Sequence, residues 1–170
     1  MRALEPDEKL VMVMAYTQNM LVRGELIARE GVRVSIWLRN QDLSDYLHLV
    51  NPQVLMFGGD APKSITYSEM YVPTQEVVAF HLAPPAADPL DYDVSEANRM
   101  MLSVTALAGT FSIQARIRVS SQTELGQSLD VLRTPWLSLY EAEITNPYIP
   151  QFNLQVPMLL VSSNAVSFGM

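Results

Sequence analysis

A short strand-forming stretch occurs twice in this chain, and the repetition restricts the folds open to it. The first copy runs from Gly24 to Leu38 and the second from Gly109 to Ser121. Gly24 aligns with Gly109, and Val32-Arg-Val-Ser35 aligns with Ile117-Arg-Val-Ser120, both at an offset of 85 residues (from 24 to 109). An apolar helical turn, a proline and a further strand follow each copy in the same order. The pattern therefore predicts two homologous repeats.

The first predicted repeat begins with two strands between Leu10 and Ala28. Gly24 interrupts the second of them, which indicates a bulge or a close backbone approach. Glu30-Gly31 is typical of a hairpin turn. Apolar and other residues then alternate from 32 to 37, as expected of a half-buried strand.

The spacing i, i+3, i+4, i+7 of one face predicts a short helix in each repeat. In the first repeat Asp42 is the expected cap, Asn51-Pro52 ends the helix, and the face is Leu43, Tyr46, Leu47 and Val50. In the second repeat Thr123 is the expected cap, Thr134-Pro135 ends the helix, and the face is Leu125, Ser128, Leu129 and Leu132.

The remaining apolar runs are predicted strands, and the connection from 58 to 73 is a candidate edge hairpin. In the second repeat a strand pair comes before the helix and two strands follow it, with Val166 and Phe168 as a possible extension. The predicted strands are Gln53–Phe57, Glu76–Leu82, the pair within Arg99–Ser121, Trp136–Tyr140 and Val156–Val161.

A proline-rich and acidic segment separates the two predicted repeats. Residues 84–98 begin with Pro84-Pro-Ala-Ala-Asp-Pro89 and lack apolar periodicity. We therefore predict a first β-rich repeat at 1–83, a linker at 84–98 and a second β-rich repeat at 99–170. The expected fold class is α+β and β-rich. Each repeat is a small bent sheet or partly open barrel with one short helix, and the two pack with pseudo-twofold symmetry because each alone has only a marginal core.

Three segments resemble a family of short, uncharacterised bacterial β-rich domains, some of which occur in tandem. They are Leu21-Val-Arg-Gly24, Asp42-Leu-Ser-Asp-Tyr-Leu47 and Val54-Leu-Met-Phe57. The second repeat departs from the helix-start motif at Leu125-Gly-Gln-Ser-Leu129. The resemblance implies a fold class, since the family has no assigned activity.

Composition disfavours several kinds of partner. The net charge is −7, from 11 Lys+Arg and 18 Asp+Glu, which repels phosphate backbones and anionic lipid. We expect neither nucleic acid nor a membrane as a partner. The chain has no cysteine, and its first ten residues lack the apolar run of a signal peptide. These features favour a cytoplasmic protein.

The sequence offers little catalytic equipment. Of the 2 histidines, His48 is expected on the polar side of the first helix, beside Ser44 and Asp45, and His81 at a strand end, where it is either structural or merely exposed. Nucleophile-elbow, zinc-protease, phosphate-loop and dinucleotide motifs are absent, and Gly58-Gly59-Asp60 is interpreted as a turn. We predict no enzyme, no catalytic residue and no cofactor.

Acidic residues do not form a recognisable metal site. Asp42 and Asp45 lack the regular oxygen-ligand spacing of a cation site, so no metal is predicted. Asp88, Asp91 and Asp93 fall in the linker and are interpreted as solvating charge.

Large side chains in the long loop are the best candidates for a contact surface. Tyr67, Met70 and Tyr71 need covering by a partner or by the chain's own sheet. We therefore predict a structural or adaptor protein acting through protein–protein contacts, with another protein or as a homo-oligomer. The alternative is a small-ligand binding module with a cleft between the repeats.

Overall fold

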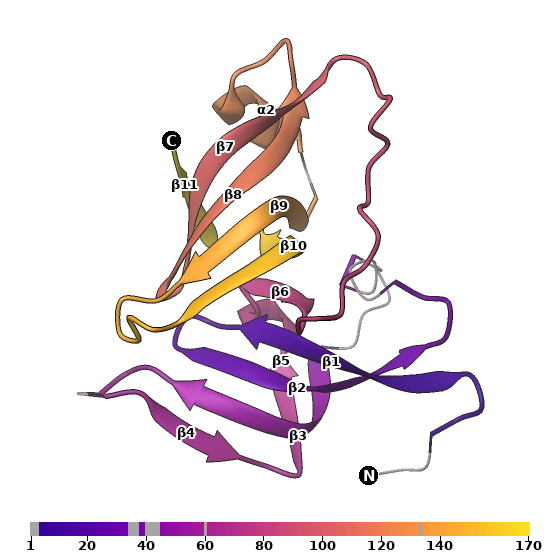
Figure 1. Ribbon diagram of the computed structural model, residues 1–170, viewed down its shortest axis with the longest axis vertical. Coiled ribbons are helices and arrows are strands. Elements are labelled where there is room, and N and C mark those ends of the chain that lie inside the picture. The colour runs from indigo at the N-terminus through magenta and orange to yellow at the C-terminus, as the bar shows by residue number, and fades with distance from the viewer. Residues whose placement is uncertain (1–3, 34–37, 40–44, 60, 133) are drawn as a thin grey trace.

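Eleven strands of this chain form one antiparallel sheet in the computed structural model, which describes residues 4–33, 38–39, 45–59, 61–132 and 134–170 (Figure 1). The first half contains β1 (Glu8–Tyr16), β2 (Met20–Arg29), β3 (Tyr46–Met56), β4 (Lys63–Thr66), β5 (Glu69–Pro73), the 3-10 turn η1 (Thr74–Glu76) and β6 (Ala79–Leu82). The second half contains β7 (Arg99–Ala108), β8 (Phe111–Ser120), the helix α2 (Leu125–Val131), β9 (Trp136–Thr145), β10 (Asn153–Ser162) and β11 (Val166–Gly169). The prediction of a β-rich chain is confirmed.

Both halves have the same strand connectivity. In the first, β1, β2 and β3 form a meander, β4 and β5 pair with successive parts of β3, and β6 returns to β1. In the second, β7 to β10 form a meander and β11 returns to β7. The sheet is open, because its order runs from β11 at one end to β4 at the other.

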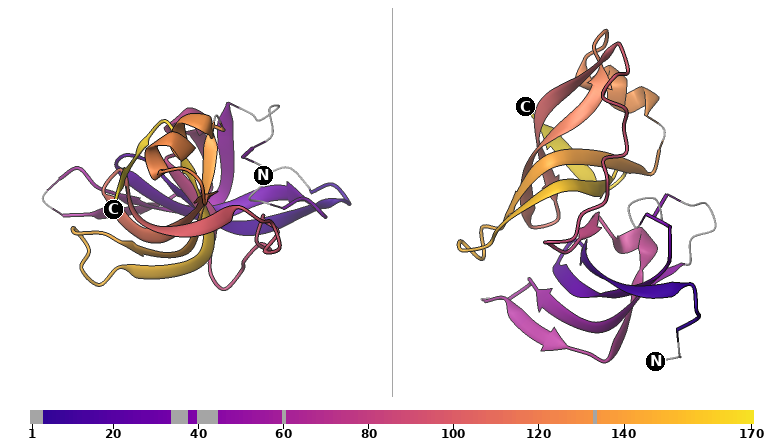
Figure 2. Two further views of the ribbon diagram at one scale, coloured as in Figure 1. Left: turned by 90° about the horizontal axis from the view of Figure 1, so that it is seen from above. Right: turned by 45° about the vertical axis from the view of Figure 1, so that its right-hand side comes forward.

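Strand β6 joins the two halves into one sheet. On one side it pairs with β1, and on the other side Ala79 and Phe80 pair with Val161 and Leu160 of β10. Figure 2 shows the halves stacked along the long axis, with β6 between them.

The halves also contribute side chains to each other's hydrophobic core. Successive residues of β1 point to opposite faces, so Ala15 enters the first core and Tyr16 enters the second. In return, Trp136 and Leu160 of the second half enter the first core. Because each core is completed from the other half, we expect the chain to unfold as one cooperative unit.

A bulge occurs at the same place in each meander. The register shifts between Arg23 and Glu25, as predicted from Gly24, and again on either side of Ala115, between 114 and 116. On the facing strands Asn51 has φ 48° and Glu141 has φ 50°. The predicted alignment of Gly24 with Gly109 is wrong, because Gly109 lies in the β7–β8 turn with φ 59°. The bulges correspond at an offset of 91 residues (from 24 to 115).

The helix predicted in the first half is replaced by β3. Leu47 and Leu49 are buried and alternate with the more exposed Tyr46 and His48, as in a strand. At the Asn51 bulge the alternation changes phase, so Val50 and Pro52 are also buried. Because of this phase change, the apolar residues of β3 fall at a spacing that resembles one face of a helix. The expected cap Asp42 and Leu43 lie outside the described residues.

The second predicted helix is confirmed as α2, but its cap is different. Glu124 is the N-cap and its side chain makes no capping hydrogen bond, whereas the Thr123 and Ser128 hydroxyl oxygens lie 2.7 Å apart. In the first half the expected strand after Gly31 is not formed at Val32 and Arg33, and residues 34–37 lie outside the described part. Residues 84–98 contain no helix or strand.

Candidate functional site

The outer face of β3 and β5 carries a cluster of three rings and one carboxylate. We call it the β5 surface, and it consists of Tyr46, His48, Glu69 and Tyr71. Strand register sets the cluster, because Tyr71 lies directly opposite His48 on the same face. Their rings stack with centroids 4.4 Å apart and an interplanar angle of 6°. Tyr46 and Tyr71 are 52% and 57% exposed, so the cluster presents a large aromatic area to solvent.

Glu69 orders the two stacked rings. Its Oε2 lies 2.9 Å from Nε2 of His48 and accepts a hydrogen bond of 3.3 Å from the Tyr71 hydroxyl. Desolvation, followed by the negative charge of Glu69, raises the pKa of Tyr71. The phenol is therefore held protonated as a donor, which suits recognition more than acid–base chemistry.

Two of the three predicted contact residues lie at the surface. Tyr71 is central to the β5 surface, and Tyr67 is 45% exposed between β4 and β5. Met70 points to the other side of β5, opposite Leu49, and packs against the first core. The loop expected around them is an edge formed by β4 and β5, both paired with β3.

His48 does not occupy the environment predicted for it. It lies on β3 with Glu69 and Tyr71 as partners, which are 21 and 23 residues away in the sequence. The predicted Ser44 partner lies outside the described residues. A strand assignment at 46–50 would have placed His48 on one face with Tyr46, but its partners Glu69 and Tyr71 are set by the register of β5 against β3.

His81 has the structural role, one of the two predicted for it, and it is deeply buried. Its Nδ1 lies 2.7 Å from the Leu82 carbonyl oxygen, which can only accept, so Nδ1 carries the proton. Nε2 therefore accepts from the Tyr16 hydroxyl, 2.8 Å away. Desolvation by burial lowers the pKa of His81 to about 4.

Asp91 contradicts the interpretation of the linker acids as solvating charge. It accepts hydrogen bonds of 2.6 Å from both Ser138 and Tyr140 of β9, and its Oδ2 lies 2.8 Å from Nη1 of Arg39. Arg39 also donates to Ser138. This group, which we call the Asp91 latch, joins residue 91 to β9 and to the Arg39 side chain. Its partners are far away in the sequence, so composition alone did not reveal it.

The charge of Asp91 is maintained by these contacts. Burial alone would raise the pKa of Asp91, but the hydrogen bonds from Ser138 and Tyr140 and the charge of Arg39 outweigh it and lower that pKa. Burial, together with Asp91, raises the pKa of Tyr140. The Tyr140 phenol therefore stays protonated and donates to Asp91, so the latch holds these residues together.

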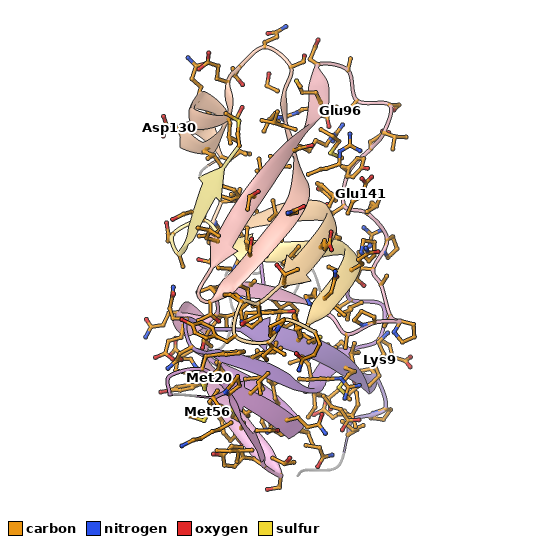
Figure 3. All side chains as sticks on the ribbon, turned by 60° about the vertical axis from the view of Figure 1, so that its left-hand side comes forward. Lys9, Met20, Met56, Glu96, Asp130 and Glu141 are labelled. Atoms are coloured by element: carbon orange, nitrogen blue, oxygen red, sulfur yellow. The ribbon has the colours of Figure 1, made fainter. Side chains whose placement is uncertain are left out.

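Replacing Asp91 with asparagine is expected to loosen the linker. Asp91→Asn removes the charge that Arg39 faces and one acceptor, at a cost of about 1–3 kcal/mol in the free energy of unfolding. Amide hydrogen exchange in residues 84–98 should accelerate, while exchange in β1 should not. The matched control is Asp130→Asn on the exposed face of α2 (Figure 3). Equal exchange in the two variants would contradict a fastening role.

A pocket of about 300 Å³ lies between the two halves. It is lined by Phe57, Gly58, Gly59, Pro62, Thr110 and Tyr148. The rings of Phe57 and Tyr148 lie 6.4 Å apart, and the buried Asn146 donates to the Thr110 hydroxyl oxygen at 3.0 Å. That hydroxyl retains its own proton for a ligand acceptor. The volume is at the lower end for small-molecule sites.

Within the described residues there is no group of three or more His, Cys, Asp or Glu side chains able to hold a metal ion. In the same part of the chain, no helix has the length and apolarity needed to cross a membrane.

A scan against protein-family models, a search of curated proteins and a search of solved structures found no match. The functional argument therefore rests on this chain's own residues.

Proposed function

We propose that this chain is a non-enzymatic, cytoplasmic structural or adaptor protein that acts through protein–protein contacts and self-associates. The observation that carries the proposal is that the sheet is open at β11 on one side and at β4 and β5, which share β3, on the other. Strands β11 and β5 each pair on one side only among the described residues, and exposed tyrosines flank β5. Unpaired strand edges readily add a further strand from another chain.

We further propose that the two halves derive from one duplicated unit and pack with pseudo-twofold symmetry. The shared connectivity, the two bulges and the facing left-handed residues Asn51 and Glu141 support this. A duplicated unit that binds its own copy within one chain retains surfaces suited to binding further copies.

The environment of the titratable side chains favours a non-enzymatic role. His81 is 3% exposed and bonded on both ring nitrogens, so it cannot reach a substrate. Tyr140 is held protonated against Asp91. His48 is the accessible imidazole, and its contacts with Glu69 and Tyr71 form a flat surface.

Self-association is expected to give a solution mass at a multiple of 19.0 kDa that rises with concentration. Tyr71→Lys places a charge at the β5 edge and should return the protein to 19.0 kDa. Tyr148→Lys changes a comparably exposed tyrosine away from β5 and should not. Light scattering on a sizing column measures all three proteins. A mass of 19.0 kDa for the unmodified chain at every concentration would contradict the proposal.

A second candidate function is small-ligand binding in the pocket between the halves. The supporting observation is that Phe57 and Tyr148, one from each half, face the same 300 Å³ space beside the Thr110 hydroxyl. The preferred ligand would be a small aromatic ring bearing a hydrogen-bond acceptor. Perturbation of the two rings' NMR signals by phenol would support this function, and unchanged signals would count against it.

A further inference from the structure

Among the described residues, one pair of strands hydrogen-bonds between the halves, and we use its register as a template for contact between copies. Strands β4 and β5 both pair with β3, so we count them together as the fourth strand of the first half and β6 as its fifth. Strand β6 pairs antiparallel with β10, the fourth strand of the second half. Phe80 lies opposite Leu160, and Ala79 lies opposite Val161. The amide of Ser162 also donates to the Val78 carbonyl oxygen at 2.9 Å. We call this arrangement the β6–β10 joint.

The same two kinds of strand are each left with an unpaired side elsewhere in the described structure. The fourth-strand position of the first half is filled by β4 and β5, which pair only with β3. The fifth strand of the second half is β11, which pairs only with β7. In the described structure the edges of β6 and β10 are thus paired with each other, whereas the corresponding edges of β11 and of β4 and β5 are unpaired.

The bulges fix which residues correspond on the fourth strands. Leu160 lies opposite Ser138, three residues before the left-handed Glu141. Tyr71 lies opposite His48, three residues before the left-handed Asn51. Tyr71 and Val72 therefore occupy the places of Leu160 and Val161.

The bulge of each half also fixes the correspondence on the fifth strands. Val13 pairs with Gly24 and Val104 pairs with Ala115, so β1 and β7 correspond at the same offset of 91 residues (from 13 to 104) and Tyr16 corresponds to Leu107. Ala79 pairs with Tyr16 and Ser167 pairs with Leu107, so Ser167 and Phe168 occupy the places of Ala79 and Phe80.

We infer that β11 of one copy pairs antiparallel with β5 of a second copy, with Phe168 opposite Tyr71 and Ser167 opposite Val72. This inference rests on the self-association proposed above and specifies its surface. The contact is head-to-tail, because two different edges meet. It leaves a further β5 and a further β11 free at the ends, so copies close into a ring or extend into a filament.

The intermolecular joint is expected to be weaker than the internal one. Pro73 occupies the place of Ser162 and has no amide proton, so the hydrogen bond corresponding to Ser162–Val78 cannot form. Exposed Tyr71 compensates in part by burying its ring against the incoming strand. Association should consequently depend on concentration.

The absence of cysteine from the chain permits a direct test of this register. Paired residues of antiparallel strands lie within the Cα separation that a disulfide spans. Purified Tyr71→Cys and Phe168→Cys proteins are mixed, oxidised with diamide and separated by size under denaturing conditions. Tyr71 is exposed and Phe168 is only partly buried on β11, so neither substitution removes a fully buried side chain. The mixture should form a disulfide-linked heterodimer, and each protein alone should form little dimer.

The matched control is Ser64→Cys on β4, an exposed edge position like Tyr71, mixed with Phe168→Cys. The mixture of Tyr71→Cys with Phe168→Cys should give about tenfold more heterodimer than this control, since only the former pair meets the distance requirement. Equal yields would overturn the inference.

The experiment separates this inference from the proposed function. The cysteine variants are mixed at a protein concentration at which light scattering on the unmodified chain shows multiples of 19.0 kDa. If Tyr71→Cys and Phe168→Cys form no heterodimer there, the interface lies elsewhere and self-association still stands. A monomeric mass at every concentration would overturn both.

Discussion

Gly109→Ala is expected to lower the free energy of unfolding by about 2–4 kcal/mol, since it combines left-handed strain with overpacking. Gly109 has φ 59°, a conformation that an L side chain adopts only at a cost. A Cβ there would lie 2.7 Å from the Thr17 carbonyl oxygen and 2.8 Å from that of Gln18. These are backbone atoms of the β1–β2 turn, so the neighbours cannot move aside cheaply.

The substitution acts at a contact between the halves, because the β7–β8 turn touches the β1–β2 turn there. Urea unfolding followed by circular dichroism measures the effect, and a single transition shifted to lower urea is the expected result. Gly126→Ala in α2 is the matched control, since a Cβ there has open space and alanine favours the helix. The control should be neutral or slightly stabilising. A Gly109→Ala protein as stable as the control would show that the turns do not meet as described.

Acidification from pH 7.5 to pH 5 is expected to remove about 2 kcal/mol of stability through His81 alone. The folded pKa is about 4 because of desolvation, whereas an unfolded histidine titrates near its ordinary value of about 6.5. Between those values the unfolded chain binds a proton that the folded chain does not. Stability is therefore fully present above about pH 6.5 and is lost as the pH falls toward 4.

The matched variant is His81→Gln, which retains a polar side chain and cannot take up a proton in this range. It should be less stable at pH 7.5, because the bond to Tyr16 is disturbed, but its stability should change much less between pH 7.5 and 5. His48→Gln removes the surface histidine and should retain the steep dependence. Urea titrations at several pH values provide the comparison. A steep dependence persisting in His81→Gln would assign the proton uptake to another group.

Much of the strand pattern was predictable, because alternation and turn residues act over a few neighbours. The strands β1, β2, β7, β8, β9 and β10 lie where apolar runs and turn signals predicted them. The bulge at Gly24 was also foreseen, since glycine tolerates the close approach of Pro52, whose Cβ would lie 3.2 Å from an added Cβ. In α2 the helical spacing was correct because no bulge interrupts it.

The candidate surface was predictable only in part. Tyr67 and Tyr71 stood out as large side chains lacking an obvious cover, and both are exposed. Met70 lies between them in sequence but faces inward, because the register of β5 against β3 decides which side each residue takes. The His48–Glu69 contact depends on the same register.

The amino-acid sequence by itself determined the β-rich character and most strand positions, since these follow from local periodicity and turn chemistry. The tertiary structure alone decided that 46–56 is a strand, because its bulge becomes visible only beside β2. It alone also decided that Asp91 bonds to β9 and that β6 unites both halves in one sheet. Those features depend on partners tens of residues apart, and only a completed hydrogen-bond ladder brings such partners together.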